Sequence, residues 1–139
     1  MICYFITCAL IISDQMVKLL NLIIGGSLGT LARYSLTHIT YHFLGAGFPY
    51  GTLIVNLTGC FIIGILATFS SGTFFLTYNH RILLVTGFCG AFTTFSTFIF
   101  DSAHLVKEGE ILKACLNIIL SIALGFVVFK VGEIVGKTL

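Results

Sequence analysis

Residues 87–98 read GFCGAFTTFSTF, and this stretch places two glycines and four hydroxyl side chains inside a long apolar segment. Glycine in a helix interior costs about 1 kcal/mol relative to alanine, and serine and threonine hydroxyls compete for the backbone partners of the helix. The stretch therefore favours a broken helix, and breaks at membrane depth occur where backbone lines a cavity or coordinates an ion. The alternative is a continuous helix whose small residues pack against a neighbour.

The composition of the whole chain places this stretch in a membrane. Of the 139 residues, 58% are hydrophobic and 9% are charged, and the mean hydropathy is +1.11. A soluble domain carries about 25% charged residues. This chain lacks the charge to solvate the surface that a small fold exposes, so most of its surface must face lipid.

Spanning the hydrocarbon core takes roughly 20 mostly apolar residues as a helix. Four segments reach that length, at residues 19–37, 50–69, 82–103 and 111–131. The joints between them, residues 38–49, 70–81 and 104–110, are short, which predicts antiparallel neighbours in one compact domain. The sequence thus predicts an all-α membrane protein with four transmembrane helices, the third of them broken, in a single domain over residues 16–139.

Residues 1–15 (MICYFITCALIISDQ) do not fit the four-span pattern. Their apolar run is too short to span, no basic residue precedes it and no A-x-A-like site follows it, which argues against a signal peptide. A second methionine, Met16, directly precedes the first long span. We therefore expect translation to start at Met16 and the leader to be a start-site artefact; an interfacial extension is the alternative.

The basic residues are split almost evenly between the two sides of the membrane. With four spans, one side holds four of them and the other holds three: Lys18, Arg81, Lys130 and Lys137 against Arg33, Lys107 and Lys113. So small a bias fixes no orientation under the positive-inside rule. It permits insertion both ways, and with it an antiparallel dimer of one sequence.

The residue inventory argues against an enzyme. No carboxylate lies in the middle of a span, and no Ser/His/Asp or Cys/His arrangement lies at depth. Arg33 and Asp101 lie near span ends, where we expect them to snorkel to the interface. The net charge is only +2 and there is no basic run, so nucleic acid is not an expected partner.

Two further features of the spans suggest neutral recognition of an ion. Asn56 is the carboxamide of the second span, and it needs either an interhelical hydrogen bond or a permeant ion to satisfy it. Phe95 and Phe98 are three residues apart on one helical face, where their positive ring edges could meet an anion; the alternative is that they are ordinary lipid-facing or packing side chains. Gly25 and Gly29 form a G-x-x-x-G pair, which favours a close helix crossing.

Taken together, three ordered motifs resemble the Fluc (CrcB-type) fluoride channel family. Residues 25–34 (GGSLGTLARY) are similar to its first-helix motif, residues 51–59 (GTLIVNLTG) to its second and residues 87–98 to its third. The resemblance covers residues 16–139. It implies a multi-pass protein of the cell (inner) membrane that passes fluoride passively and selectively, exporting it and reducing its cytoplasmic concentration.

The family also implies an antiparallel, dual-topology homodimer with two pores, each lined by both subunits. By motif position, Asn56 would donate a hydrogen bond to fluoride near the vestibule. Phe95 and Phe98 would be the paired pore rings, with Ser96 and Thr97 in the polar track of the broken helix.

Two further assignments follow from the resemblance. The break would turn the backbone carbonyls of Gly90 and Thr93 toward a central structural sodium ion shared by the subunits. In the fourth helix, Ser121 matches the pore serine of the family, but Asn117 stands where some members carry a tyrosine.

Two other functions compete with a fluoride channel. A small multidrug-type transporter shares the four-helix, dual-topology outline, but it depends on a first-helix glutamate for proton coupling, and the first span here has no carboxylate. A non-conducting membrane assembly subunit would use the glycines for packing alone, and its purified form would pass no ion.

Overall fold

The computed structural model describes the backbone of residues 2–69 and 77–138 and the side chains from residue 12 onward in these ranges. The regular elements there are α1 (Ile2–Leu44), α2 (Tyr50–Phe69), α3 (Tyr78–Arg81), the π-helical segment η1 (Ile82–Cys89), α4 (Gly90–Phe92), α5 (Phe95–Lys107) and α6 (Ile111–Thr138). Four described segments are long and apolar enough to cross a membrane: Ile12–Leu44, Tyr50–Phe69, Tyr78–Lys107 and Ile111–Thr138. The predicted all-α fold with four spans is confirmed.

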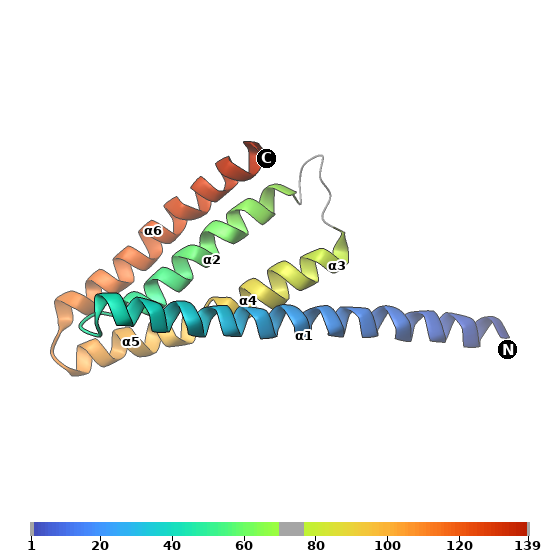
Figure 1. Ribbon diagram of the computed structural model, residues 1–139, viewed down its shortest axis with the longest axis horizontal. Coiled ribbons are helices and arrows are strands. Elements are labelled where there is room, and N and C mark those ends of the chain that lie inside the picture. Colours follow the sequence, from blue (N-terminus) through green and yellow to red (C-terminus); the bar gives the residue numbers. More distant parts are fainter. Residues whose placement is uncertain (1, 70–76, 139) are drawn as a thin grey trace.

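α1 is longer than the predicted first span, because nothing in its sequence ends the helix before Gly45. It runs without interruption from Ile2 to Leu44, and Figure 1 shows its amino-terminal part reaching beyond the other helices. Gly45 has a φ of +74° and donates its N–H to the Tyr41 carbonyl at 3.0 Å, the left-handed helix ending that glycine favours. The prediction of a joint over residues 38–49 was therefore wrong, since most of it is helix.

α2 and α6 run side by side (Figure 1) and touch through their backbones. A Cβ atom on Gly64 would collide with the Phe129 carbonyl oxygen, and one on Gly132 with the Phe61 carbonyl oxygen. Small residues at such crossings let two membrane helices approach closely. This closely packed pair lies beside the broken third span.

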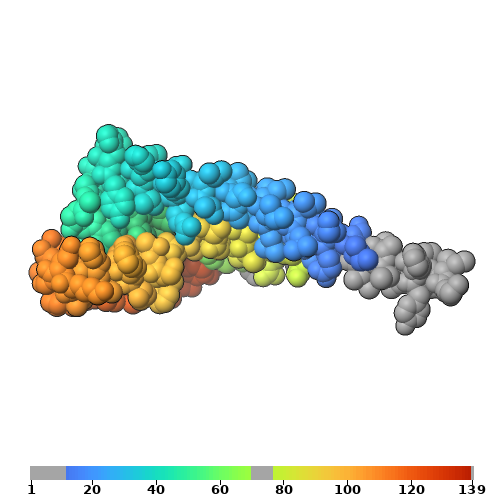
Figure 2. All heavy atoms as spheres, turned by 90° about the horizontal axis from the view of Figure 1, so that it is seen from below, coloured from blue at the N-terminus to red at the C-terminus, as the bar shows by residue number. Residues whose placement is uncertain are grey.

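The first half of the third span packs on α1 in the same way. Gly25 and Gly29 face the carbonyl oxygens of Leu83 and Phe88 so closely that neither position has room for a Cβ atom. The close crossing expected from the G-x-x-x-G pair is confirmed. Figure 2 shows α1 and the third span lying against each other on one face of the molecule.

The third span is broken, as predicted, but the break lies at Thr93 and Thr94. Both residues are extended, with ψ of 158° at Thr93 and φ of −149° at Thr94. Gly90, where the break was expected to begin, is helical with φ of −62° and ψ of −37°. The chain therefore leaves the helix at two threonines; of the two glycines before them, Gly87 packs on α1 and Gly90 lies at the surface of the protomer.

Large apolar side chains cover the outside of the protomer. Leu31, Leu112 and Ile122 are each more than 60% exposed, at 63%, 74% and 66%. Water would hydrate such a surface at a high cost in free energy, so these side chains need lipid or another apolar surface. The fold is that of a multi-pass membrane protein.

Candidate functional site

Asn56 holds the broken segment through two hydrogen bonds. Its Nδ2 donates to the Thr94 carbonyl oxygen at 3.1 Å, and the Thr94 N–H donates to Asn56 Oδ1 at 2.9 Å. An extended residue at membrane depth needs such partners, because lipid offers none. Of the two alternatives for Asn56, the structure shows the interhelical hydrogen bond, and it leaves the second N–H of Nδ2 without a described partner.

The amino terminus of α5 begins inside the membrane and is rich in hydroxyl groups. Thr94 caps it: its Oγ1 accepts from the Thr97 N–H at 3.2 Å and donates to Thr97 Oγ1 at 2.9 Å. Ser96 Oγ lies 3.4 Å from Thr94 Oγ1. The free N–H groups and the dipole at a helix amino terminus favour an anion.

Beside this terminus lies a hollow of about 330 Å³ between α1, α2 and α5. Most of its lining surface is apolar, but all except one of the lining residues carry a polar group, and one carries a guanidinium: Thr30, Arg33, Tyr34, Thr37, Tyr41, Thr52, Val55, Thr94 and Thr97. No carboxylate among the described residues pairs with Arg33. The hollow thus combines a cation, hydroxyl donors and a helix amino terminus, which together suit a small anion.

Arg33 lies in the lining of this hollow; that it snorkels to the interface stays a prediction. A sequence feature could have indicated this position. Gly29 lies one helical turn before Arg33, so both share a face of α1, and Gly29 packs directly on the third span.

Phe95 and Phe98 lie together, as their spacing predicts. Their ring centroids are 5.8 Å apart, with 43° between the ring planes. Their exposure differs sharply, however: Phe98 is 7% exposed and Phe95 is 74% exposed. One ring therefore belongs to the interior of the protomer, and the other points out of it.

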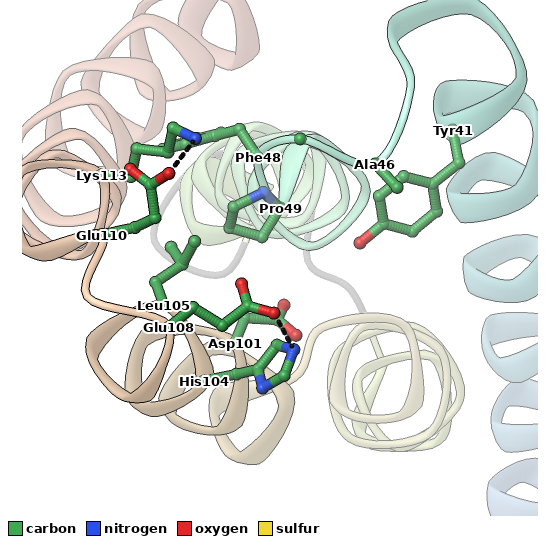
Figure 3. Close-up of a pocket in the computed structure, with 11 residues that line it drawn as sticks. Tyr41, Ala46, Phe48, Pro49, Asp101, His104, Leu105, Glu108, Glu110 and Lys113 are labelled. Atoms are coloured by element: carbon green, nitrogen blue, oxygen red, sulfur yellow. Dashed lines mark ion pairs between the residues drawn. The ribbon is translucent and has the colours of Figure 1, made fainter.

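A second hollow, of about 360 Å³, opens where α5 ends and α6 begins. Figure 3 shows two ion pairs in its lining: His104 Nε2 lies 3.2 Å from Glu108 Oε1, and Lys113 Nζ lies 3.1 Å from Glu110 Oε1. With Asp101 also in the lining, this end is richer in carboxylates than the first hollow.

One hydrogen bond joins the linings of the two hollows. Thr52, in the first lining, donates from Oγ1 to Asp101 Oδ2, in the second, at 2.6 Å. Tyr41 lines both hollows. Asp101 accepts this hydrogen bond from Thr52, which is only 4% exposed; that Asp101 snorkels to the interface stays a prediction.

Ser121 is the one predicted pore residue on α6. Its hydroxyl is buried without a described partner, and it lines neither hollow. Asn117, one turn earlier, is fully buried and donates from Nδ2 to Ser102 Oγ at 2.9 Å. The structure thus gathers Asn56, Phe95, Ser96, Thr97 and Phe98 around the start of α5, and Ser121 lies on the neighbouring helix α6.

The carbonyl oxygens of Gly90 and Thr93 accept no backbone hydrogen bond from the described residues. The Thr94 N–H, which would bond to Gly90 in a continuous helix, donates to Asn56 instead. Unpaired carbonyl oxygens are hard ligands of the kind that small hard cations prefer. No group of three His, Cys, Asp or Glu side chains able to hold a metal occurs in the described part of the chain.

Comparison with known proteins places this geometry in a family. A family model described as "CrcB-like protein, Camphor Resistance (CrcB)" matches residues 20–133. A fluoride-specific ion channel FluC from Dehalococcoides mccartyi is 39% identical over 122 residues, which cover 88% of this chain and 94% of that protein. The proteins of the same name from Desulforapulum autotrophicum and Geobacter metallireducens are 40% and 43% identical, over 86% and 77% of this chain and 96% and 86% of their own lengths. A match of that extent shows that the chain belongs to the CrcB-like family.

Proposed function

We propose that this chain is a passive, fluoride-selective ion channel, not an enzyme, that exports fluoride across the cell (inner) membrane and so lowers its cytoplasmic concentration. The observation that carries the proposal is the amino terminus of α5. It begins at membrane depth beside a hollow that holds Arg33 and several hydroxyls. The names of the relatives, which are fluoride-specific channels, point the same way.

The energetics favour neutral donors over a fixed charge at the narrow part of the path. Moving a carboxylate-sized ion into a low-dielectric medium costs on the order of 20 kcal/mol in the Born limit, and a smaller ion costs more. Conduction nevertheless requires weak binding, so that the ion can leave. Hydroxyls from Ser96 and Thr97, the free N–H of Asn56 and the ring edges of Phe95 and Phe98 supply many weak donors. Ser121 extends the set along α6.

A partner subunit is needed to complete such a path. Phe95 is 74% exposed, and Ser96 and Thr97 are exposed beside it, so one protomer covers only one side of these groups. An antiparallel homodimer, permitted by the even split of basic residues, would cover them with a second copy and build two pores. Lipid would contact the remaining apolar surface.

The unpaired carbonyls of Gly90 and Thr93 would hold a structural sodium ion at the centre of that dimer. With no carboxylate in the set, the oxygens favour a monovalent ion. Such a cation would attract fluoride from a distance. The backbone carbonyls would only hold the cation in place.

Efflux from liposomes tests the function. The purified protein should release fluoride down its gradient, without proton coupling, and pass chloride orders of magnitude more slowly. Phe95→Ile or Phe98→Ile should sharply reduce fluoride efflux, because side-chain volume stays similar while the ring edge is lost. Phe43→Ile, at an exposed ring of α1 that lines neither hollow, is the matched control and should conduct normally. Equal fluoride and chloride efflux would refute selectivity.

A further inference from the structure

A chain of buried hydrogen bonds joins α6 to the backbone of α5. Asn117 donates from Nδ2 to Ser102 Oγ at 2.9 Å, and Ser102 donates from Oγ to the Phe98 carbonyl oxygen at 2.8 Å. Asn117 is fully buried, Ser102 is 6% exposed and Phe98 is 7% exposed. Because Ser102 has a single hydroxyl proton, the donation from Asn117 to its oxygen leaves that proton for the Phe98 carbonyl.

Packing alone does not account for Asn117. Its Oδ1 atom is buried with no hydrogen-bond partner among the described residues, and an unsatisfied buried acceptor destabilises a fold. Replacing both partners of a buried hydrogen bond with apolar groups of similar shape can be neutral or even stabilising. An apolar pair would therefore hold α5 against α6 at a lower cost in free energy.

What the hydrogen-bond chain adds is a fixed geometry at one turn of α5. A serine hydroxyl that bonds to the carbonyl four residues earlier bends a helix slightly, and here the amide of another helix holds that hydroxyl in place. The affected turn carries the Phe98 ring, which lies 5.8 Å from the ring of Phe95. A small rotation of α5 would change the direction in which the ring edges of Phe98 and Phe95 point, since both rings are on this helix.

We infer that Asn117 is a positioning residue for Phe98: through Ser102 it fixes the α5 backbone at the turn that carries the ring. The inference rests on the proposed pore role of Phe98. Asn117 itself does not touch the ion in this scheme. Its effect is on how closely the Phe98 ring edge approaches fluoride, and thus on the preference for fluoride over chloride.

The test is Asn117→Leu in liposomes, together with heat stability in detergent. We expect a protein at least as stable as wild type, with fluoride efflux lower by about tenfold, by analogy with the loss of up to about a hundredfold when a catalytic group is misplaced by 1 Å, and a lower fluoride-to-chloride permeability ratio. Ser102→Ala should lower the ratio in the same way, and Ser102→Thr, which keeps the hydroxyl, should restore it. A purely structural residue would change stability and the amount of active protein but not the ratio.

Thr58→Ala is the matched control. Thr58 Oγ1 donates to the Ile54 carbonyl at 2.8 Å within α2, the same intrahelical bond without a described second helix behind it, and its loss should leave the ratio at the wild-type value. An unchanged ratio in Asn117→Leu and Ser102→Ala overturns the inference; if Asn117→Leu fails to fold, Ser102→Ala decides. Phe98→Ile distinguishes the positioning role of Asn117 from the pore role of Phe98. If Phe98→Ile changes the ratio while Asn117→Leu and Ser102→Ala do not, only the positioning role is refuted. If Phe98→Ile leaves the ratio unchanged as well, the pore role is refuted too.

Discussion

Different interactions hold the two halves of the third span in place. Before the break, η1 and α4 lie against α1 with backbone on backbone, at Gly25, Gly29 and Gly87. After the break, α5 is tied to its neighbours by side-chain hydrogen bonds. These bonds are Asn56 to Thr94 at the break, Thr52 to Asp101, and Asn117 to Ser102.

This difference separates the two explanations of a polar, glycine-rich span. Glycines that pack on a neighbouring backbone give close van der Waals contact and offer no donor to an ion. Hydroxyls and amides that hold an extended segment keep spare donors and acceptors near a hollow. In residues 87–98 of this protein, the part before the break packs closely on α1, and the part after it carries the donors of the candidate site.

The largest expected effect comes from filling the backbone contact before the break. In Gly29→Ala the new Cβ atom would collide with the Phe88 carbonyl oxygen, and overpacking of this kind costs typically about 1–3 kcal/mol. We expect a lower melting temperature in detergent and little dimer. Gly26→Ala, three residues earlier and with no atom within 4 Å of its Cβ position, should be neutral or slightly stabilising. Equal behaviour of the two variants would contradict the packing role.

Breaking the hydrogen bonds between Asn56 and Thr94 should cause the second largest loss of stability and the largest loss of fluoride efflux. Asn56→Ala leaves the N–H and the carbonyl of Thr94 unpaired; because both bonds are only part-buried, each loss should cost toward the lower end of about 1–3 kcal/mol, and the variant should abolish fluoride efflux. Asn56→Asp keeps an acceptor for the Thr94 N–H but places a negative charge near the path, so it should also block efflux. Wild-type efflux and heat stability in both variants would show that the break persists without Asn56.

Much of this architecture was predictable from the sequence, and the exceptions have physical reasons. Span number follows from apolar length, and the close crossing at Gly25 and Gly29 follows from a local spacing. The position of the break does not, because a residue on another helix, Asn56, decides where the backbone leaves the helix. The position of Arg33 in the first hollow could not be predicted for the same reason, because residues of α2 and α5 complete that hollow.

A smaller effect is expected from the cap of α5. Thr94→Ala removes the oxygen that accepts from the Thr97 N–H, and loss of such a cap costs typically about 1 kcal/mol. Thr94→Ser keeps the oxygen and should retain wild-type heat stability and most of the fluoride efflux. If alanine and serine behave alike at this position, capping does not hold α5, and the contrast between the two halves of the span weakens.

The smallest effect on folding should come from Gly90→Ala, a glycine of the same stretch that lies at the surface of the protomer. Its Cβ position has only the Val85 carbonyl oxygen nearby, at 3.8 Å, which is an ordinary contact, and alanine favours a helix over glycine by up to about 1 kcal/mol. Helix content on heating, followed by circular dichroism, should therefore match wild type or improve slightly. Any loss of dimer must then arise outside the protomer, at the partner or at the proposed sodium ion, and a comparison of sodium with choline buffers distinguishes these two. Loss of the helical fold itself would mean that Gly90 packs as Gly29 does, and the boundary between support and site would have to move toward the threonines.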